Sequence, residues 1–438
     1  MNRLRGSALV SATVVALALT ACSSTEPEEG NTPSGETTGA TSAREITGDI
    51  TVSSWRFADP SEIGQLHVRL LEEFNESQDA ITVTAEPVPY NDVNTQLVNS
   101  VLSGNPADLV AIGPSELPSN VEYLQPIDEF WEAEGAEFQD AFGDAAKALA
   151  SYDGHVYGIV IEQSTTDGLW YNKEVLDAAG VDPEEAVKSW DNYVAALQKI
   201  KDAGFTPMLF EAINSTRMDR HWAWYVSGGA DMSDPATYVT EMCSTESQET
   251  FGWLADLHLQ GLVPNPAGMG YEESTRQFAA GGVGFYTDGA WGPATYAAYD
   301  ESIVDKLGYT HLPPKEEGGQ LGANLDGLLW VIPKGSPNPE AAFEVMKYMS
   351  SAESQLQMVA NNQIPTRTAL LDDPVVKDSA ELAFFGGLID EWGFPRPRAP
   401  YMAEFKQVFI EGFQAAVTGQ EEPAAAHAAV CERLATLG

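Results

Sequence analysis

Basic side chains are scarce in this sequence. Among 438 residues, 23 Lys and Arg stand against 65 Asp and Glu, and the formal net charge is −42. A surface of that sign repels the phosphates of nucleic acids, so the composition argues against a nucleic-acid-binding role. It argues equally against attachment to an anionic bilayer through a basic patch. We interpret the acidity as dispersed, solvated surface charge.

Cysteine and metal-ligand patterns are also sparse. The chain has three cysteines. Cys22 belongs to the N-terminal segment discussed below, which leaves Cys243 and Cys431 as an even number of cysteines. Outside the cytosol such a pair is permitted to form a disulfide, although the sequence alone does not establish that the two meet. The six histidines are scattered without the spacing of metal ligands. We therefore predict no metal site and no cofactor.

Long apolar runs are missing after the N-terminal segment, because no later window offers the ~18 consecutive apolar residues of a transmembrane helix. At the N-terminus, Arg3 and Arg5 precede an apolar stretch typical of a secretory signal. It ends in Leu19-Thr20-Ala21-Cys22, which resembles the bacterial lipobox, where the cysteine is acylated and the chain is cut just before it. We predict a lipoprotein signal peptide over residues 1–21 and a lipid anchor on Cys22.

Residues 22–47 are rich in Ser, Thr, Gly, Glu and Pro and nearly free of large apolar side chains. Such a segment cannot bury enough surface to fold, so we predict a flexible tether. Together with the anchor, it would hold a globular part at the outer face of the bacterial cytoplasmic membrane.

Strand and helix patterns alternate where the tether ends. Strand patterns over 46–53, 81–87 and 107–112 enclose helical patterns over 61–74 and 93–102, the latter followed by Gly104. This βαβαβ order predicts an α/β protein with a mostly parallel sheet.

Familiar catalytic motifs are absent: the sequence has no HExxH, Gly-x-Ser-x-Gly, P-loop or EF-hand pattern. The Gly-rich segment 281–284 does not match the dinucleotide-binding fingerprint. Paired carboxylates for glycoside hydrolysis stay open as an alternative, because a sequence gives no separation between them. The pattern favours binding over catalysis, so no enzyme activity is predicted.

Short motifs recur in order over residues 48–410, behind the lipobox. They include EFN (73–75), ITV (81–83), SGNPAD (103–108), YGIV (157–160), WYNKE (170–174), SWD (189–191), FAAG (278–281), DGAW (288–291), VIPK (331–334), SPNPE (336–340), SSAESQ (350–355) and IP (364–365). Their order and spacing resemble the family 1 extracellular solute-binding proteins of sugar ABC importers, the group that includes maltose-binding protein.

The resemblance implies a two-lobe, periplasmic-binding-protein-like α/β fold with discontinuous lobes. Three crossings between the lobes are expected near Val160–Ser164, Asn324–Leu328 and Gln363–Arg367. Short crossings can absorb a hinge rotation while both cores stay packed. The expected boundaries are 48–160 plus 329–363 for the N-terminal lobe and 164–323 plus 368–438 for the C-terminal lobe.

The function that the resemblance implies is capture of a sugar or oligosaccharide between the lobes and its delivery to ABC permease subunits in the membrane. The protein is expected to act as a monomer and to leave the sugar unaltered. Two alternatives stay open: the same fold binding a cationic amine such as a polyamine, and a surface-tethered glycoside hydrolase. Neither the sugar and its length nor the matching permease and ATPase follow from the sequence.

Candidate ligand residues are aromatic and polar side chains near predicted strand ends, since aromatic rings cover the CH faces of a sugar and polar groups bind its hydroxyls. Glu162 resembles the family's hinge glutamate and Trp291 its stacking tryptophan. The segment 221–225 is read either as core or as a ligand wall, whereas Trp170 and Tyr171 are assigned to packing. The predicted ligand residues are Trp55, Arg56, Ser115, Glu116, Glu162, Gln163, Trp222, Trp224, Asp288, Trp291, Asn324, Asp326, Arg367 and Trp392, with Arg396 and Arg398 beside the last.

Overall fold

A computed structural model describes residues 46–165, 167–211, 218–232, 237–264 and 270–437. The described residues belong to one compact unit. The predicted signal peptide, Cys22 and most of the predicted tether lie outside the described residues. Within the described ranges, no helix has the length and apolar character needed to cross a membrane.

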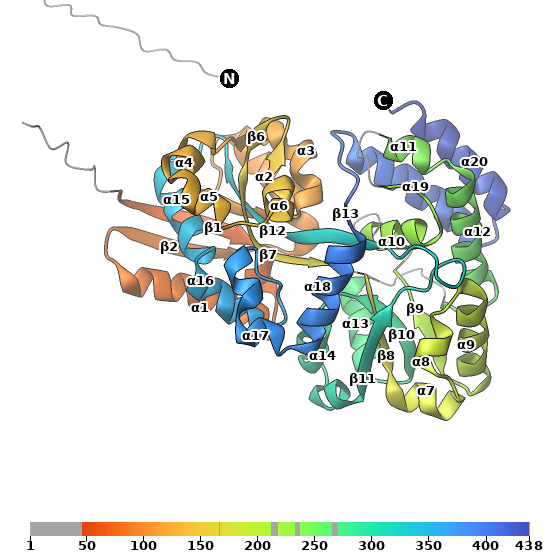
Figure 1. Cartoon of the computed structure of the whole chain (residues 1–438). Helices are drawn as coiled ribbons and strands as arrows, with labels where there is room; N and C mark the ends of the chain where they lie inside the picture. The colour runs from red at the N-terminus through yellow and green to blue at the C-terminus, as the bar shows by residue number, and fades with distance from the viewer. Residues whose placement is uncertain (1–45, 166, 212–217, 233–236, 265–269, 438) are drawn as a thin grey trace, which may run out of the picture. The chain divides into compact units, whose positions relative to one another are not determined.

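The first of two main sheets follows the order β13-β12-β3-β1-β2, with β4 and β7 also paired to β12 (Figure 1). Strand β1 runs parallel to both β2 and β3, so the predicted βαβαβ start is confirmed. The strands of this sheet in the described residues are β1 (Gly48–Ser54), β2 (Ile81–Pro87), β3 (Leu109–Ile112), β4 (Leu124–Gln125), β7 (Gly158–Thr165), β12 (Ala323–Pro333) and β13 (Gly393–Pro395).

Alternation along β1 explains how this sheet is covered. Ile50 and Val52 point to one face, where they join a core cluster with Leu66 and Leu70 of α1. Helix α2 ends at Gly104, whose φ of 75° favours glycine and whose N–H bonds back to the last turn. The helices around this sheet are α1 (Glu62–Ser77), α2 (Val93–Ser103), α3 (Leu117–Asn120), α4 (Asp128–Ala133), α5 (Gly135–Asp140), α6 (Asp144–Leu149), α15 (Pro339–Met349) and α16 (Ala352–Val359).

The second main sheet has the order β11-β8-β10-β9 and mixes parallel with antiparallel pairs. Its strands are β8 (Gly168–Asn172), β9 (Thr206–Leu209), β10 (Val283–Asp288) and β11 (Leu307–His311), and a separate hairpin joins β5 (Ser151–Tyr152) to β6 (His155–Val156). The remaining helices are α7 (Lys173–Ala179), α8 (Pro183–Ala186), α9 (Trp190–Asp202), α10 (Asp219–Ser227), α11 (Tyr238–Glu241), α12 (Thr245–Leu259), α13 (Tyr271–Ala279), α14 (Gly292–Ala297), α17 (Pro374–Lys377), α18 (Ala380–Trp392), α19 (Met402–Val417) and α20 (Pro423–Leu434).

The three predicted crossings lie side by side. Strands β7 and β12 pair antiparallel from Leu325 opposite Thr165 onward, with an irregularity in register between Leu328 and Leu329. Gln163 and Ile364 exchange two backbone hydrogen bonds of 3.0 and 3.1 Å. Figure 1 shows β7 and β12 extending from the first sheet toward the half that holds the second sheet.

Cys243 and Cys431 are joined by a disulfide, with their Cα atoms 5.7 Å apart. The bond ties the segment after α11 to helix α20, across a sequence separation of 188 residues. The pairing that the sequence left open is therefore present in the structure.

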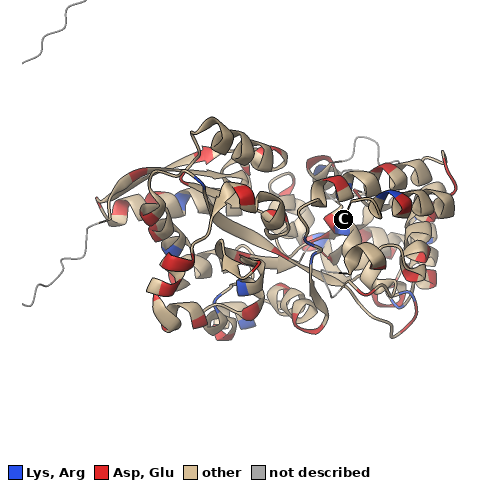
Figure 2. Ribbon diagram, turned by 90° about the horizontal axis from the view of Figure 1, so that it is seen from above, with Lys and Arg blue, Asp and Glu red and all other residues tan. Residues whose placement is uncertain are grey.

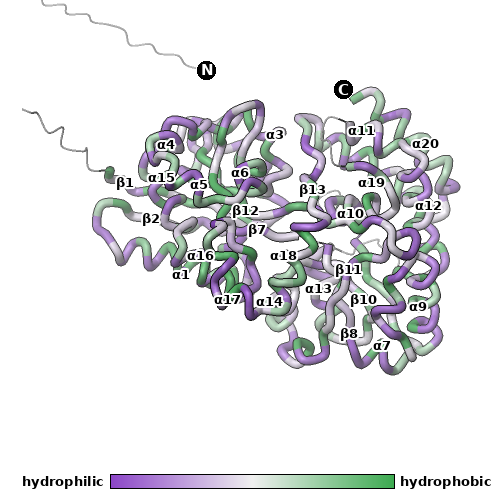
Figure 3. Tube along the Cα trace, viewed as in Figure 1, coloured by the Kyte–Doolittle hydropathy of each residue, from purple (hydrophilic) through white to green (hydrophobic). Residues whose placement is uncertain are grey.

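Charge and hydropathy are distributed as the composition suggests. Figure 2 shows Asp and Glu spread over many helices of both halves rather than gathered in one region. Figure 3 shows hydrophobic and hydrophilic residues alternating along the outer helices, as expected for helices with one buried face. This agrees with dispersed surface charge.

Candidate functional site

The first group of predicted residues is centred on Arg56, in the short 3-10 helix Trp55–Ala58 that follows β1. The Arg56 Nε donates to Glu162 Oε1 at 2.9 Å, and its Nη2 contacts the same oxygen. Asp59 lies 3.4 Å from another guanidinium nitrogen, and His67 of α1 approaches Glu162 at 3.6 Å. We call Arg56, Asp59, His67 and Glu162 the Arg56 group.

Electrostatics fix the charge state of this group. Burial by itself raises the pKa of Glu162, but the neighbouring Arg56 and His67 lower it to about 2. Burial lowers the pKa of His67, with Glu162 opposing that effect. Glu162 is therefore an ionised, buried partner that holds Arg56 in place, and Arg56 is the more exposed member of the pair.

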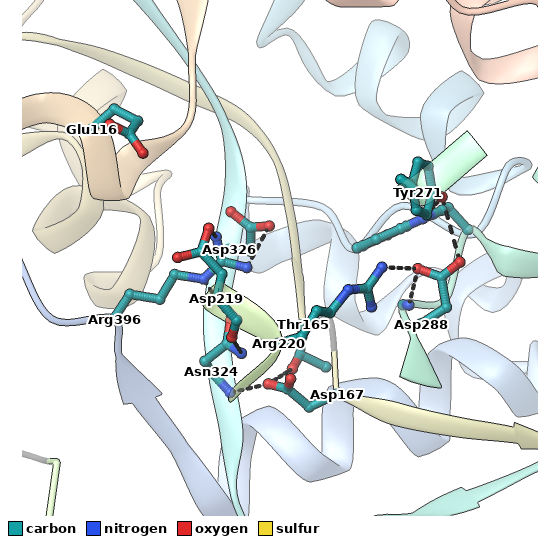
Figure 4. Close-up of polar contacts among 12 residues, drawn as sticks. Glu116, Thr165, Asp167, Asp219, Arg220, Tyr271, Asp288, Asn324, Asp326 and Arg396 are labelled. Carbon is teal, nitrogen blue, oxygen red and sulfur yellow. Dashed lines mark hydrogen bonds and ion pairs between the residues drawn. The ribbon is translucent and has the colours of Figure 1, made fainter. Parts of the chain in front are cut away.

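The second group is centred on Asp288, the last residue of β10. This carboxylate is fully buried and accepts hydrogen bonds from Arg220 Nη2 at 2.8 Å, Tyr296 Oη at 2.9 Å and the Gly289 N–H at 3.0 Å. The Tyr271 hydroxyl also donates to it, at 3.4 Å. Figure 4 shows Arg220 and Tyr271 directed at Asp288 from two sides. These four donors engage both carboxylate oxygens.

Trp291 is attached to this group through Tyr271. Its indole Nε1 donates to the Tyr271 hydroxyl at 2.9 Å, and the ring is half-buried. The Arg220 guanidinium lies 5.8 Å from the centre of the Tyr271 ring, a cation–π contact. We call Arg220, Tyr271, Asp288 and Trp291 the Arg220 group. In it, Asp288 is a buried support for the two aromatic rings rather than an accessible polar group.

The third group surrounds Arg396, just after β13. Its guanidinium donates to Asn324 at 2.6 Å, to Asp326 at 2.8 Å and to Asp219 at 3.1 Å (Figure 4). Asn324 and Asp326 belong to β12, whereas Asp219 begins α10. The Asn324 N–H in turn donates to Asp167 at 2.5 Å. Arg396 thus joins strand β12 to helix α10.

Lys406 of α19 extends this group toward the first sheet. Its Nζ lies 2.7 Å from Glu116 and 3.4 Å from Asp219. Burial alone would lower the pKa of Lys406, but the two carboxylates raise it, so the ammonium stays charged. Glu116 closes the 3-10 helix Pro114–Glu116 just after β3, with Ser115 buried beside it. We call Glu116, Asp219, Asp326, Arg396 and Lys406 the Arg396 group.

Contacts link elements that flank different sheets. Helix α1, which covers the first sheet, contacts α14, which follows β10 of the second sheet. Lys406 of α19 contacts Glu116 just after β3. Tyr90, which follows β2, packs edge-on against Trp55, with ring centroids 5.3 Å apart. We call the three groups with Trp55 and Tyr90 the junction site.

Trp222 and Trp224 are core residues, which corrects their assignment as ligand residues. The segment forms helix α10, so its side chains do not alternate as in a strand, and every residue of the helix is buried. Trp222 stacks on Phe405 at 5.7 Å, and Trp224 packs against Trp253 at 5.5 Å. Trp170, assigned to packing from the sequence, is buried and stacks on Phe385.

Other predicted residues lie apart from the three groups. Arg367 donates to the Ser350 carbonyl at 2.5 Å and lies 4.8 Å from the Phe142 ring centre, so it braces loops beside the first sheet. Gln163 takes part through its backbone at the crossing. Arg398 donates to the Ala148 carbonyl at the end of α6. Trp392 is the half-buried last residue of α18.

Several members of the junction site were not predicted from the sequence: Asp59, His67, Tyr90, Asp219, Arg220, Tyr271 and Lys406. One signal was readable. Lys406 interrupts the apolar face of α19, where Met402, Phe405 and Phe409 are buried. A cation in such a position is usually paired. The others occur in ordinary polar contexts that gave no signal.

The chemistry available here is hydrogen bonding and ring stacking. Among the described residues, no group of three or more His, Cys, Asp or Glu side chains is arranged to hold a metal ion. The charged groups pair with one another, and half-exposed aromatic rings lie beside them. Such a surface is suited to a polar solute with hydroxyl groups and apolar faces.

Comparison with known proteins gives a family and a fold. The family described as bacterial extracellular solute-binding protein matches residues 69–384. The arabinooligosaccharide-binding protein of Bacillus subtilis (strain 168) is 24% identical over 336 residues, covering 70% of each chain.

Two solved structures superpose with a TM-score of 0.79. The GacH receptor of Streptomyces glaucescens, solved unliganded and with acarbose, is 21% identical and covers 90% of this chain and 99% of its own. An ABC transporter solute-binding protein from Thermotoga lettingae, bound with α-D-tagatose, is 18% identical and covers 89% of this chain and 100% of its own. The two-lobe α/β fold class predicted from the sequence is confirmed.

Proposed function

Because this chain belongs to the family of bacterial extracellular solute-binding proteins, we propose that it captures a carbohydrate at the junction site and presents it to an ABC importer. The ligand class draws support from the relatives, one named for arabinooligosaccharides and one bound with tagatose. The relatives reported above are binding proteins, and the proposed action is likewise binding without chemical change to the sugar.

One observation carries the proposal: a half-exposed indole is held in place beside ion-paired polar side chains. The Trp291 ring is tied to Tyr271 by a hydrogen bond, and Tyr271 is tied to Asp288. A fixed aromatic ring packs on the CH face of a sugar without first losing conformational freedom. Glu116 and Asp326 lie among the polar groups that would bind the hydroxyls.

The proposed mechanism is closure of two lobes around the sugar. We assign residues 48–160 plus 329–363 to one lobe and 164–323 plus 368–438 to the other. The three crossings are hydrogen-bonded to one another, which supports a hinge at this place. When the lobes rotate, the backbone angles that change would be confined to these few residues. A sugar that contacts both lobes favours the closed state, which the membrane permease would recognise.

The proposed location is the outer face of the cytoplasmic membrane. The support is the lipobox-like sequence that ends in Cys22, followed by a segment too polar to fold. Acylation of Cys22 would keep the binding unit near its permease while residues 23–45 span the gap. Mass spectrometry of the membrane-extracted protein tests this: the expected species begins at Cys22 and carries acyl chains, and an unmodified N-terminus would contradict it.

A thermal-shift and calorimetry panel tests the ligand class. The mature chain with Cys22→Ser, which stays unacylated, is mixed with arabinotriose, maltotriose, mannotriose or spermidine. A ligand of the native state at about 100 times its Kd stabilises the protein by about 2.7 kcal/mol, so binding by at least one saccharide is expected to raise the melting temperature. Small-angle scattering should show a more compact particle with that saccharide.

Three results would contradict the proposal. A shift with spermidine alone would favour an amine as the ligand. Chromatographic recovery of a cleaved saccharide would favour a glycoside hydrolase. No shift across a wider saccharide panel would remove the carbohydrate assignment altogether.

A further inference from the structure

Three ion pairs of the junction site present the carboxylate outward and the cation inward. In the Lys406–Glu116 pair, the side chains are 7% and 24% exposed; in Arg396–Asp326, 4% and 20%; and in Arg56–Asp59, 13% and 23%. The Arg220–Asp288 pair is buried on both sides and offers no accessible charge. The Arg56–Glu162 pair is reversed, with the cation 13% and the carboxylate 2% exposed. At Glu116 and Asp326, a solute therefore meets carboxylate oxygens before it meets the paired cations.

Hydrogen-bonding capacity reinforces this asymmetry. Ionised carboxylates only accept hydrogen bonds, so they suit the hydroxyls of a neutral sugar or the ammonium of an amino sugar. A carboxylate or phosphate on the solute would have no proton to donate and would carry the same charge as the surface. Lys406 and Arg396 lie 2.7 and 2.8 Å from Glu116 and Asp326, and each cation is the less exposed member of its pair.

From this arrangement we infer that the junction site selects neutral and amine-bearing saccharides and rejects uronic acids and sugar phosphates. Glu116 and Asp326 are the residues that set this charge preference. The inference rests on the proposed function, since it takes the junction site as the place where a saccharide binds. A like charge held about 6 Å from one carboxylate and about 9 Å from the cation behind it, at an effective dielectric constant of about 40, loses about twofold in affinity, and an ammonium in the same place gains about as much. Two such pairs therefore separate an anionic from a cationic derivative by on the order of tenfold.

The overall charge of the protein needs to be separated from this local effect. A net charge of −42 disfavours every anionic solute, whatever the site contains. Removing one carboxylate changes that net charge by one unit wherever it is removed, so a matched variant away from the site distinguishes the two effects. Glu134 provides it: its carboxylate lies 2.7 Å from Lys347 and is 29% exposed, much like Glu116 beside Lys406.

The test uses calorimetry on the mature chain with Cys22→Ser. The probes are the tightest-binding neutral trisaccharide of the panel above and two derivatives of it. In these, the terminal hydroxymethyl group is converted to an aminomethyl group or to a carboxylate. The proteins are the parent, Asp326→Asn, Glu116→Gln and Glu134→Gln. Asp326→Asn retains an oxygen that accepts the Arg396 hydrogen bond, so the variant is expected to fold, and its melting curve checks this.

We expect the parent to bind the carboxylate derivative at least tenfold more weakly than the aminomethyl derivative. The ratio of the two dissociation constants, carboxylate over aminomethyl derivative, should fall at least threefold in Asp326→Asn and in Glu116→Gln. Glu134→Gln should leave this ratio unchanged. Added salt should compress the ratio in the parent as screening increases.

The inference is overturned if the parent binds both derivatives equally. It is also overturned if Glu134→Gln narrows the ratio as much as the two site variants, because net charge would then be the cause. Binding of the neutral trisaccharide in either case leaves the proposed function standing. If no saccharide binds, the proposed function fails and this inference fails with it.

Discussion

Replacing Tyr271 with phenylalanine removes the hydroxyl that connects Trp291 to Asp288. The hydroxyl accepts from the indole Nε1 at 2.9 Å and lies 3.4 Å from Asp288 Oδ2. Asp288 retains its bonds from Arg220, Tyr296 and the Gly289 backbone. We expect Tyr271→Phe to fold, with a free energy of unfolding lowered by about 1 kcal/mol, the net contribution of one neutral hydrogen bond.

The larger consequence concerns binding. Without the hydroxyl, the half-exposed Trp291 ring regains rotamer freedom, which a stacked sugar must then remove. Immobilising one such side chain costs about 0.5–1.5 kcal/mol, so the panel trisaccharide should bind Tyr271→Phe about two- to tenfold more weakly. The phenyl ring keeps its place beside Arg220, so the cation–π contact is preserved.

A double-mutant cycle by calorimetry decides whether the effect passes through Trp291. The four proteins are the parent, Tyr271→Phe, Trp291→Ala and the double variant. Because Tyr271 is argued to act by orienting the indole, Tyr271→Phe should cost affinity in the parent but almost none when the indole is absent. An equal loss in both backgrounds would refute the reasoning, since Tyr271 would then act on the sugar directly or through another residue.

Three further predictions concern Trp291, Glu162 and the Cys243–Cys431 disulfide. Trp291→Ala should weaken saccharide binding by about 1–3 kcal/mol and leave cooperative unfolding intact; unchanged affinity in calorimetry would remove this ring from the site. The pKa of Glu162, about 2, lies below its ordinary 4.5, so about 3 kcal/mol of stability is present above that ordinary value and is lost as pH falls toward 2. Denaturant titrations across this range should show the loss in the parent and not in Glu162→Gln, and parallel losses would contradict it. Reducing the Cys243–Cys431 disulfide should lower the free energy of unfolding by about 2–5 kcal/mol, and superimposable melting curves with and without reductant would count against that role.

The architecture was predictable because its signals are local and redundant. Alternation along residues 46–53 and the apolar spacing over 61–74 specify a strand and a helix with one buried face each. Gly104 ends α2 because its left-handed conformation suits glycine. Errors at this level were confined to places where a local pattern is ambiguous. The segment 221–225 has aromatics at alternate positions, which suits a strand as well as a fully buried helix, and the structure has a helix.

The candidate site was predictable only in part. A residue's position after a strand can be read from the local sequence, but the partners of its side chain cannot. Trp55, Arg56 and Glu116 stand next to strand ends, so their chain positions gave a usable signal. What each side chain contacts is decided by segments far away in sequence. Glu162 was predicted to touch ligand, yet it is buried beneath Arg56, its partner 106 residues earlier. Asp288 likewise proves to be a support for Tyr271.

Lys406 shows both what the sequence indicates locally and what only the folded structure reveals. A lysine on an apolar helix face indicates that its ammonium is paired, since an isolated buried ammonium is too costly to keep charged. The sequence does not say with what, because Glu116 lies 290 residues away and Asp219 lies on a third element. Both carboxylates raise the pKa of Lys406 against the effect of burial, so the contact helps keep the ammonium charged. In the contact with Glu116 the carboxylate is the more exposed member, at 24% against 7% for Lys406. The charge that a sugar would meet at the proposed site therefore depends on the pairing of distant segments, and it arises only once the chain has folded.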